Sequence, residues 1–203
     1  MAPQAGQSPC LLRADDNSWS VVPINDSKYG CNAVTWAPYG HLGSTEGDQV
    51  VKRIATGSCD NLVRVFKCAA VEGGWEWKQE AALGGEGVGH SDWVRDVAWA
   101  PSSGMPCNTI ASCSGVRLSS VCDRAWVRYL IMHSISQDGT VIIWKQQAGA
   151  DWKPTKLPAF NSPVWRVSWS VTGNMLAVRG TPTPHLFVSA CWLDVGVLQL
   201  LDA

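Results

Sequence analysis

The sequence of 203 residues has little charge of either sign. Charged residues make up 16% of the chain, the formal net charge is −1, and no run of Lys or Arg occurs. Proteins that bind nucleic acid or anionic membranes by electrostatics present a basic surface. The composition therefore argues against nucleic acid or a membrane surface as the main partner.

Targeting and metal-binding signals are also missing. The start, MAPQAGQSPCLLRADD, has no basic region followed by an apolar stretch, so no signal peptide is expected. The most apolar segment, residues 185–201, is short for a membrane span and contains Asp194, so no transmembrane segment is expected. The eight Cys residues form no C-x-x-C pair and no zinc spacing. We predict free thiols in a reducing compartment, with no metal and no cofactor.

Tryptophan and turn-forming residues are abundant. The chain has 12 Trp, 19 Gly and 11 Pro. Frequent Trp with many turn formers indicates short strands joined by tight turns.

A short motif occurs three times. The stretch AVTWAP at residues 33–38 returns as DVAWAP at 96–101 and, more weakly, as RVSWS at 166–170. Apolar and polar residues alternate in each copy, which is typical of a half-buried strand. The motif predicts that Trp36, Trp99 and Trp169 occupy equivalent positions in three inner strands.

The first two copies are followed by matching segments. IATGSCDNLVRVFK at 54–67 matches IASCS at 110–114 joined to QDGTVIIWK at 137–145. Asp60 precedes Phe66 by the same spacing as Asp138 precedes Trp144, so Phe66 and Trp144 are predicted at one position of the third strand. Outer strands are predicted at 75–80 and within 151–160. Four antiparallel strands per repeat are typical of a propeller blade. A β-sandwich with chance similarity is the alternative.

The second repeat is interrupted at residues 115–136. In the first repeat Cys59 alone separates Ser58 from Asp60, whereas this long segment separates Ser114 from Gln137. Its removal restores the match, so we interpret it as translated intron sequence or the product of a mis-joined gene. A functional loop is the alternative, because a turn tip accepts insertions at low thermodynamic cost.

Polar residues of the second repeat predict a buried network. A Gly-His pair ending at His90 and a closing Trp144 have the spacing of a WD repeat. We predict that Asp138 accepts a hydrogen bond from the His90 ring, and that Ser112 or Ser114 links this ring to the Trp144 indole.

A catalytic reading of the same residues is the alternative. His90 and Asp138 would form a dyad, with Ser91 or Ser114 as nucleophile. The sequence has no G-x-S-x-G elbow and no third acid at a recognisable position, so no catalytic residue is predicted. The first repeat lacks the Gly-His pair and has Phe66 instead of Trp, so Asp60 is predicted only to shape its turn.

The repeats resemble one family in particular. YGCNAVTWAP, VKRIATGSCDNLVRVFK, GHSDWVRDVAWAPS, TIASCS joined to QDGTVIIW, and VWRVSWSVTGNMLAV are similar to the small WD-repeat subunit of the COPII outer coat, which is shared with the outer ring of the nuclear pore. The match spans residues 11–178 apart from 115–136. It implies an all-β, six-bladed and incompletely closed propeller, which a larger partner completes with a short sheet of its own.

The resemblance also implies a function. Family members are non-enzymatic scaffolds in ER-to-Golgi transport and in the nuclear pore. It implies a location on the cytoplasmic face of the endoplasmic reticulum, on COPII vesicles and at the nuclear pore, peripheral to the membrane. The implied partners are the larger outer-coat subunit and nuclear pore scaffold proteins.

The chain departs from the family at its ends. It begins near the outer strand of a third blade, at residues 11–22, so we expect about two full blades and parts of two others. Residues 1–10 are predicted to be a disordered leader, and 179–203 a tail foreign to the family, since Pro182 and Pro184 fit no blade strand. The prediction is a truncated or mis-spliced scaffold propeller. A general WD-repeat adaptor, such as a substrate receptor, is the alternative.

Overall fold

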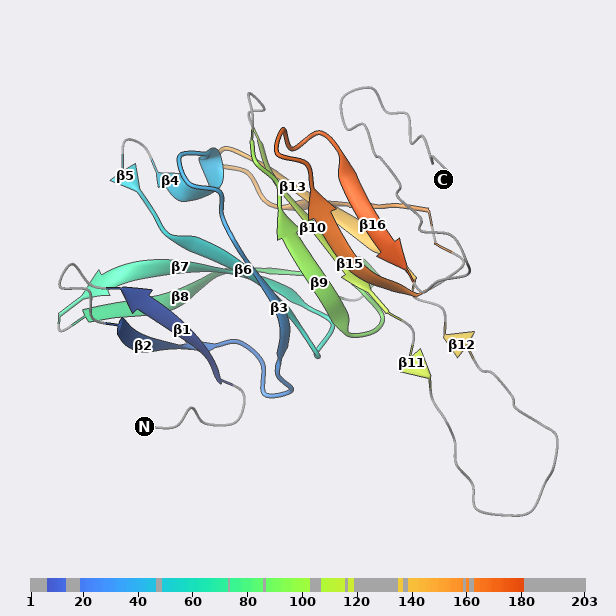
Figure 1. The fold of residues 1–203 in the computed structure, drawn as a ribbon, viewed down its shortest axis with the longest axis horizontal. Helices are drawn as coiled ribbons and strands as arrows, with labels where there is room; N and C mark the ends of the chain where they lie inside the picture. The colour runs from blue at the N-terminus through green and yellow to red at the C-terminus, as the bar shows by residue number, and fades with distance from the viewer. Residues whose placement is uncertain are drawn as a thin grey trace, which may run out of the picture.

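The computed structural model describes residues 7–13, 19–46, 49–72, 74–85, 87–102, 107–115, 117–118, 135–136, 139–158, 160 and 163–180. These residues form antiparallel strands and one short 3-10 turn, η1 (Leu42–Ser44) (Figure 1). Among them, no helix is long and apolar enough to cross a membrane.

Two four-stranded sheets make up most of the molecule. The first consists of β3 (Cys31–Trp36), β6 (Arg53–Ser58), β7 (Val63–Val71) and β8 (Gly74–Leu83) in that order. The second consists of β9 (Val94–Trp99), β10 (Cys107–Ser114), β13 (Val141–Gln147) and β14 (Lys153–Lys156). Neighbours in each sheet follow chain order, as the repeats predict for two blades.

Smaller two-stranded elements flank these sheets. The hairpins are β1 (Gln7–Arg13) with β2 (Trp19–Asn25), and β15 (Val164–Trp169) with β16 (Leu176–Gly180). The two-residue pairs are β4 (Thr45–Glu46) with β5 (Gln49–Val50), and β11 (Arg117–Leu118) with β12 (Ile135–Ser136).

The two sheets share one register. Trp36 lies opposite Ile54, which lies opposite Phe66. In the second sheet Trp99 lies opposite Ile110, which lies opposite Trp144. The third inner strand places Trp169 opposite Leu176. Trp36 and Trp99 therefore occupy the same strand type, and Phe66 and Trp144 the same position of the third strand.

The register also shifts at the same level in all three inner strands. The shift lies between Cys31 and Ala33 in β3, opposite the Cys113–Ser114 step of β10 in β9, and between Val164 and Arg166 in β15. The extra residues of these bulges are Asn32, Arg95 and Trp165. A bulge bends its strand and re-aims its side chain.

The sheets and hairpins stack face to face, and a separate apolar core fills each interface. Figure 1 shows the β1–β2 hairpin beside β7 and β8, and the β15–β16 hairpin beside β9 and β10. Ile24 packs with Ile54 and Phe66 in the first core. Val65 packs with Val97 and Trp144 in the second, and Ile143 packs with Val167 and Leu176 in the third. Because each complete sheet packs against a neighbour on both of its faces, stability is shared between adjacent units, as in other repeat proteins.

Two predicted boundaries fall inside strands of the structure. The β1 strand begins at Gln7, within the predicted leader 1–10, and the segment 11–22, predicted as one outer strand, overlaps both β1 and β2. Pro9 lies opposite Pro23 in this hairpin. Proline is rare in strands, so these two residues argue against a strand when only the sequence is read. Edge strands nevertheless tolerate proline, and the pairing of β1 with β2 is continuous around both residues. At the other end, β16 continues to Gly180, beyond the predicted boundary at 178, while 181–203 lie outside the described residues.

The ladder of the second sheet runs unchanged across the interruption. Cys113 lies opposite Val141, as Gly57 lies opposite Val63 in the first sheet. Gly115 is buried, and the pairs Arg117–Ser136 and Leu118–Ile135 form a separate two-stranded element. The rest of 115–136, together with Asp138, lies outside the described residues.

Deletion of residues 115–136 is expected to stabilise the protein by about 1 kcal/mol, because closing a short turn costs less entropy than closing a long one. Urea unfolding of the deletion variant beside the parent chain measures the change. An unchanged or lowered midpoint would favour a functional loop.

Candidate functional site

His90 lies at the centre of a buried polar cluster in the second sheet. It precedes β9, and only 7% of its surface is exposed. Its Nε2 lies 2.8 Å from Ser112 Oγ on β10, and its Nδ1 lies 3.3 Å from Thr140 Oγ1 next to β13. The ring thus joins the loop before the inner strand to the second and third strands.

Ser112 is the link between the histidine and the tryptophan. The Trp144 indole N–H donates a hydrogen bond of 2.9 Å to Ser112 Oγ. A serine hydroxyl that accepts this bond can still donate its own proton to the His90 ring. Ser114 takes another partner, donating to the carbonyl of Gly115 at 3.5 Å. Of the two serines named from the sequence, Ser112 makes the contact, and Asp138 is outside the described residues.

Only one of the two serines considered as nucleophiles is accessible. Ser114 is fully buried, as is Ser112, so no substrate can reach either hydroxyl. Ser91, the other candidate, is exposed and lies in the loop before β9. In the described part of the chain no cluster of three His, Cys, Asp or Glu side chains could hold a metal ion. The cluster instead satisfies polar groups that would be costly to bury alone.

The first sheet has an acidic counterpart that the sequence analysis missed. Thr56 Oγ1 donates to Asp26 Oδ1 at 2.9 Å, and the Ser58 hydroxyl donates to Asp26 Oδ2. The Arg64 guanidinium approaches the same carboxylate at 3.4 Å. Thr56 and Ser58 correspond by register to Ser112 and Ser114, so Asp26 takes the place of His90.

Asp60 lies in the turn between β6 and β7. Its Oδ1 accepts a hydrogen bond from the backbone N–H of Leu62 at 3.3 Å. It also pairs with Arg64, whose Nη2 lies 2.5 Å from Oδ2. Burial alone would raise the pKa of Asp60, but hydrogen bonds and charge from Arg64 outweigh this effect and hold the pKa below its usual value.

Asp60→Asn is therefore expected to lose a pH-dependent part of the stability. Because the folded-state pKa is lowered, ionised Asp60 stabilises the fold above its unfolded-state pKa, and this contribution disappears as the pH falls through the folded-state pKa. Urea unfolding from pH 7 down to about pH 3 should show the parent and the variant converging below about pH 4. A constant difference across this range would contradict the assignment.

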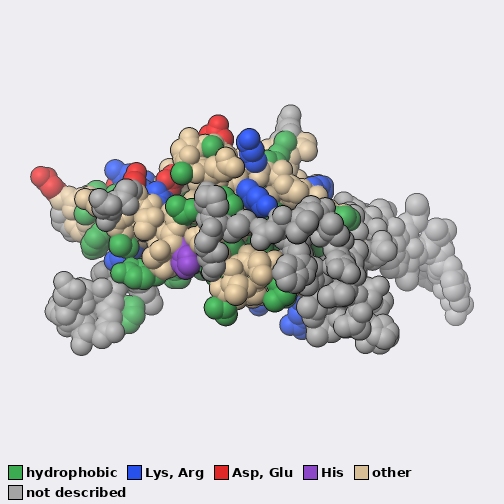
Figure 2. Space-filling view, turned by 90° about the horizontal axis from the view of Figure 1, so that it is seen from above, with side chains coloured by type: hydrophobic (Ala, Val, Ile, Leu, Met, Phe, Trp, Pro, Cys, Tyr) green, Lys and Arg blue, Asp and Glu red, His purple; other side chains and the backbone are tan. Residues whose placement is uncertain are grey.

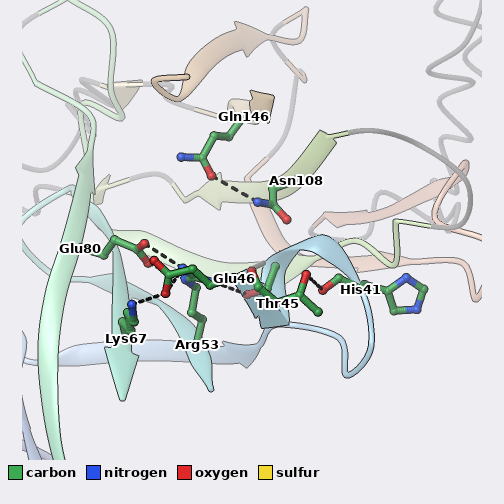
Figure 3. A network of polar contacts seen from close by, with 9 residues as sticks. His41, Thr45, Glu46, Arg53, Lys67, Glu80, Asn108 and Gln146 are labelled. Atoms are coloured by element: carbon green, nitrogen blue, oxygen red, sulfur yellow. Dashed lines mark hydrogen bonds and ion pairs between the residues drawn. The ribbon is translucent and has the colours of Figure 1, made fainter. Parts of the chain in front are cut away.

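A polar cleft of about 470 Å³ lies between the two complete sheets. Figure 3 shows Arg53 of β6 between Glu46 and Glu80, with Asn108 and Gln146 of the second sheet facing them. Arg53 forms a bidentate pair with Glu80, at 2.6 Å and 3.0 Å. Lys67 pairs with Glu46. These charges neutralise one another, so the cleft offers no unpaired charge to a ligand.

The side chains around this cleft are mixed in sign. In Figure 2, seen from the end that carries η1, acidic, basic and apolar groups are interspersed over the described residues.

Comparison with known proteins identifies relatives along most of the chain. A protein SEC13 homolog of Homo sapiens is 40% identical over 184 residues, which are 86% of this chain and 48% of that protein. The protein transport protein SEC13 of Mycosarcoma maydis is 35% identical over 205 residues, again 48% of that protein. The chain is homologous to SEC13. The resemblance found in the sequence is thereby confirmed.

The chain spans about half the length of the SEC13 relatives that it matches. No protein-family profile matches it. Among solved structures, Sqt1 from Chaetomium thermophilum has a TM-score of 0.54 at 19% identity, over 88% of this chain and 36% of that one. This likeness concerns the fold alone. With SEC13 homology and the order of the sheets, it confirms the prediction of an all-β, partial WD-repeat propeller.

In addition to the apolar cores, polar contacts join the SEC13-like repeats at their inner strands. Asn32 Nδ2 donates to the carbonyl of Val94 at 2.8 Å, and Val167 N donates to Asp96 Oδ2 at 3.0 Å. The Trp169 indole donates to the carbonyl of Ala98 at 3.1 Å. Each bond joins one inner strand to the next, β3 to β9 or β9 to β15.

Proposed function

We propose that the chain functions in a non-enzymatic scaffold propeller of the COPII vesicle coat, in ER-to-Golgi transport, and of the outer ring of the nuclear pore. Homology to SEC13 proteins, one of them named a protein transport protein, carries this proposal. The buried His90–Ser112–Trp144 cluster supports a structural role for the residues that could otherwise form a catalytic dyad.

The proposed partners are the larger subunit of the COPII outer coat and scaffold proteins of the nuclear pore. Such a partner would add a sheet to an open side of the stack. The described chain has apolar groups available there: Val34 is 61% exposed and Trp36 is 50% exposed on β3. The location that follows is peripheral, on the cytoplasmic face of the endoplasmic reticulum, on COPII vesicles and at the nuclear pore.

A chimera tests this assignment. Residues 31–158 without 115–136 would replace the matching blades of the human SEC13 homolog, and binding to the larger coat subunit would be measured by co-purification and titration. We expect parental affinity, because the replaced blades would keep the register and the contacts between inner strands. A chimera that folds but fails to bind would contradict the proposal.

The chain by itself is expected to bind the larger subunit at least about tenfold more weakly than the human SEC13 homolog, because a sheet is stabilised by its neighbours and open apolar faces favour aggregation. Titration of both proteins under one set of conditions measures the ratio. Comparable affinity would place the docking surface within residues 23–170.

A further inference from the structure

An arginine lies between two tryptophans where the inner strands begin. The Arg95 guanidinium carbon is 5.3 Å from the Trp93 ring centroid and 5.3 Å from that of Trp165. Trp93 precedes β9, and Trp165 belongs to β15 of the next repeat. The stack therefore bridges two repeats through cation–π contacts, which are favourable when the cation is partly desolvated.

The backbone bulges create this arrangement. Arg95 and Trp165 are the extra residues of the bulges in β9 and β15. A bulged residue leaves the regular alternation of faces, so its side chain turns away from the cores. Because β9 and β15 pack against each other, the two re-aimed side chains meet near the starts of these strands.

Two more arginines stand beside the stack. Arg166 follows Trp165, and it lies directly opposite Arg179 in the β15–β16 ladder. Both side chains are exposed. Like charges directly opposite in a sheet are destabilising, so this pair is not explained by stability of the hairpin.

These arginines form no close ion pair with an acidic side chain of the described residues. Within the described ranges, no carboxylate lies within ion-pair distance of Arg95, Arg166 or Arg179, and Arg95 Nε is buried without a hydrogen-bond partner. Asp96 is the nearby acid, but its two oxygens accept the backbone N–H groups of Val97 and Val167. Burial raises the pKa of Asp96, and the charge of Arg166 lowers it by a smaller amount, so Arg166 acts on Asp96 without forming an ion pair with it.

We propose that Trp93, Arg95, Trp165, Arg166 and Arg179, here called the arginine platform, bind an acidic peptide segment of a partner protein. A carboxylate takes two parallel hydrogen bonds from a guanidinium, and Trp165, 40% exposed, offers an apolar surface beside it. The platform is small and the chain as a whole has a net charge of −1, whereas nucleic acid is held by long basic grooves. This surface is independent of the coat assignment.

The probe is a fluorescein-labelled hexaglutamate peptide, titrated with the full chain and followed by fluorescence anisotropy. The matched control peptide is hexaglutamine. Binding of hexaglutamate alone, weakened by added salt, is the expected result, because exposed charges are screened. Failure of hexaglutamate to bind, or equal binding of both peptides, would overturn the proposal.

Variants locate the site. Arg95→Gln is expected to weaken binding about tenfold or more, as loss of a charge-assisted hydrogen bond does. Arg166→Gln and Arg179→Gln should each weaken it several-fold, while Lys153→Gln, on exposed β14, should leave it unchanged. Equal affinity in all four variants would overturn the proposal.

A stability measurement separates binding from folding. Arg179→Gln should raise the unfolding midpoint, since it removes like-charge repulsion, while it weakens peptide binding. A higher unfolding midpoint together with weaker peptide binding in Arg179→Gln excludes misfolding as the cause of the lost binding. The test therefore stays valid if Arg95→Gln fails to fold. Tighter binding of an oligothymidylate than of hexaglutamate, with the same dependence on the arginines, would overturn the peptide assignment in favour of nucleic acid.

Discussion

Trp144→Ala is expected to destabilise the protein by about 3–5 kcal/mol, the range typical of a buried Trp truncated to Ala. Trp144 is only 2% exposed and belongs to the core between the two complete sheets, with Val65 and Val97. Removal of the indole would leave a cavity that faces both sheets. Two interfaces of the stack would be weakened at once, because the second sheet supports the β15–β16 hairpin on its other face.

Urea unfolding followed by circular dichroism measures this effect, since tryptophan fluorescence would itself be altered. Trp144→Phe is the matched variant, because Phe66 fills the same position of the first sheet. Phe keeps most of the apolar volume but leaves Ser112 without the indole donor, so its effect should be much smaller than that of Ala. Equal effects of Ala and Phe would show that the hydrogen bond, rather than packing, dominates at this position.

His90→Ala is expected to destabilise the second sheet by about 1–3 kcal/mol, because it leaves a buried polar group of Ser112 or Thr140 without its partner. Ser112→Ala should have an effect of similar size, since it removes the acceptor of the Trp144 indole as well as the contact to His90. The hydroxyls of Ser112 and Thr140 are both buried, so neither can replace the lost hydrogen bond with one to bulk water.

The double variant decides whether the residues act as one unit. If His90 and Ser112 share a network, the combined loss should be well below the sum of the single losses. Asp138→Ala, combined with His90→Ala, tests the hydrogen bond between Asp138 and His90 that the sequence predicts. Asp138 lies outside the described residues. Strict additivity in the His90–Ser112 cycle would contradict a shared network. Matched controls are Ser170→Ala and His41→Ala, which change residues outside it.

The repeated strands could be predicted because the sequence carries their spacing directly. The Trp motif and the distance from Asp60 to Phe66 fixed the register of both complete sheets, even across 115–136. Burial enforces this register, since a slip of one residue would move every apolar side chain to the wrong face. The spacing of the WD repeat also predicted a link from His90 to Trp144 through Ser112 or Ser114.

The features that sequence analysis missed depend on tertiary contacts. Asp26 precedes Trp36 by one residue more than His90 precedes Trp99, and it is a different residue type, so no pattern equates the two. Thr56 and Ser58 on β6 were the signal that the sequence offered, because buried hydroxyls need a hydrogen-bond partner, and here that partner is Asp26. The β1 strand was not predicted because it contains Pro9, and only its pairing with β2 identifies it as a strand.

The repeated bulge bends the inner strand of each repeat at the same level. Asn32, Arg95 and Trp165 interrupt their ladders there, and a bulge increases the local right-handed twist. This bend therefore belongs to the backbone of each repeat and does not depend on closure of a ring. Blades cut from such a chain would retain their bend, which makes them interchangeable modules for building rings of altered size.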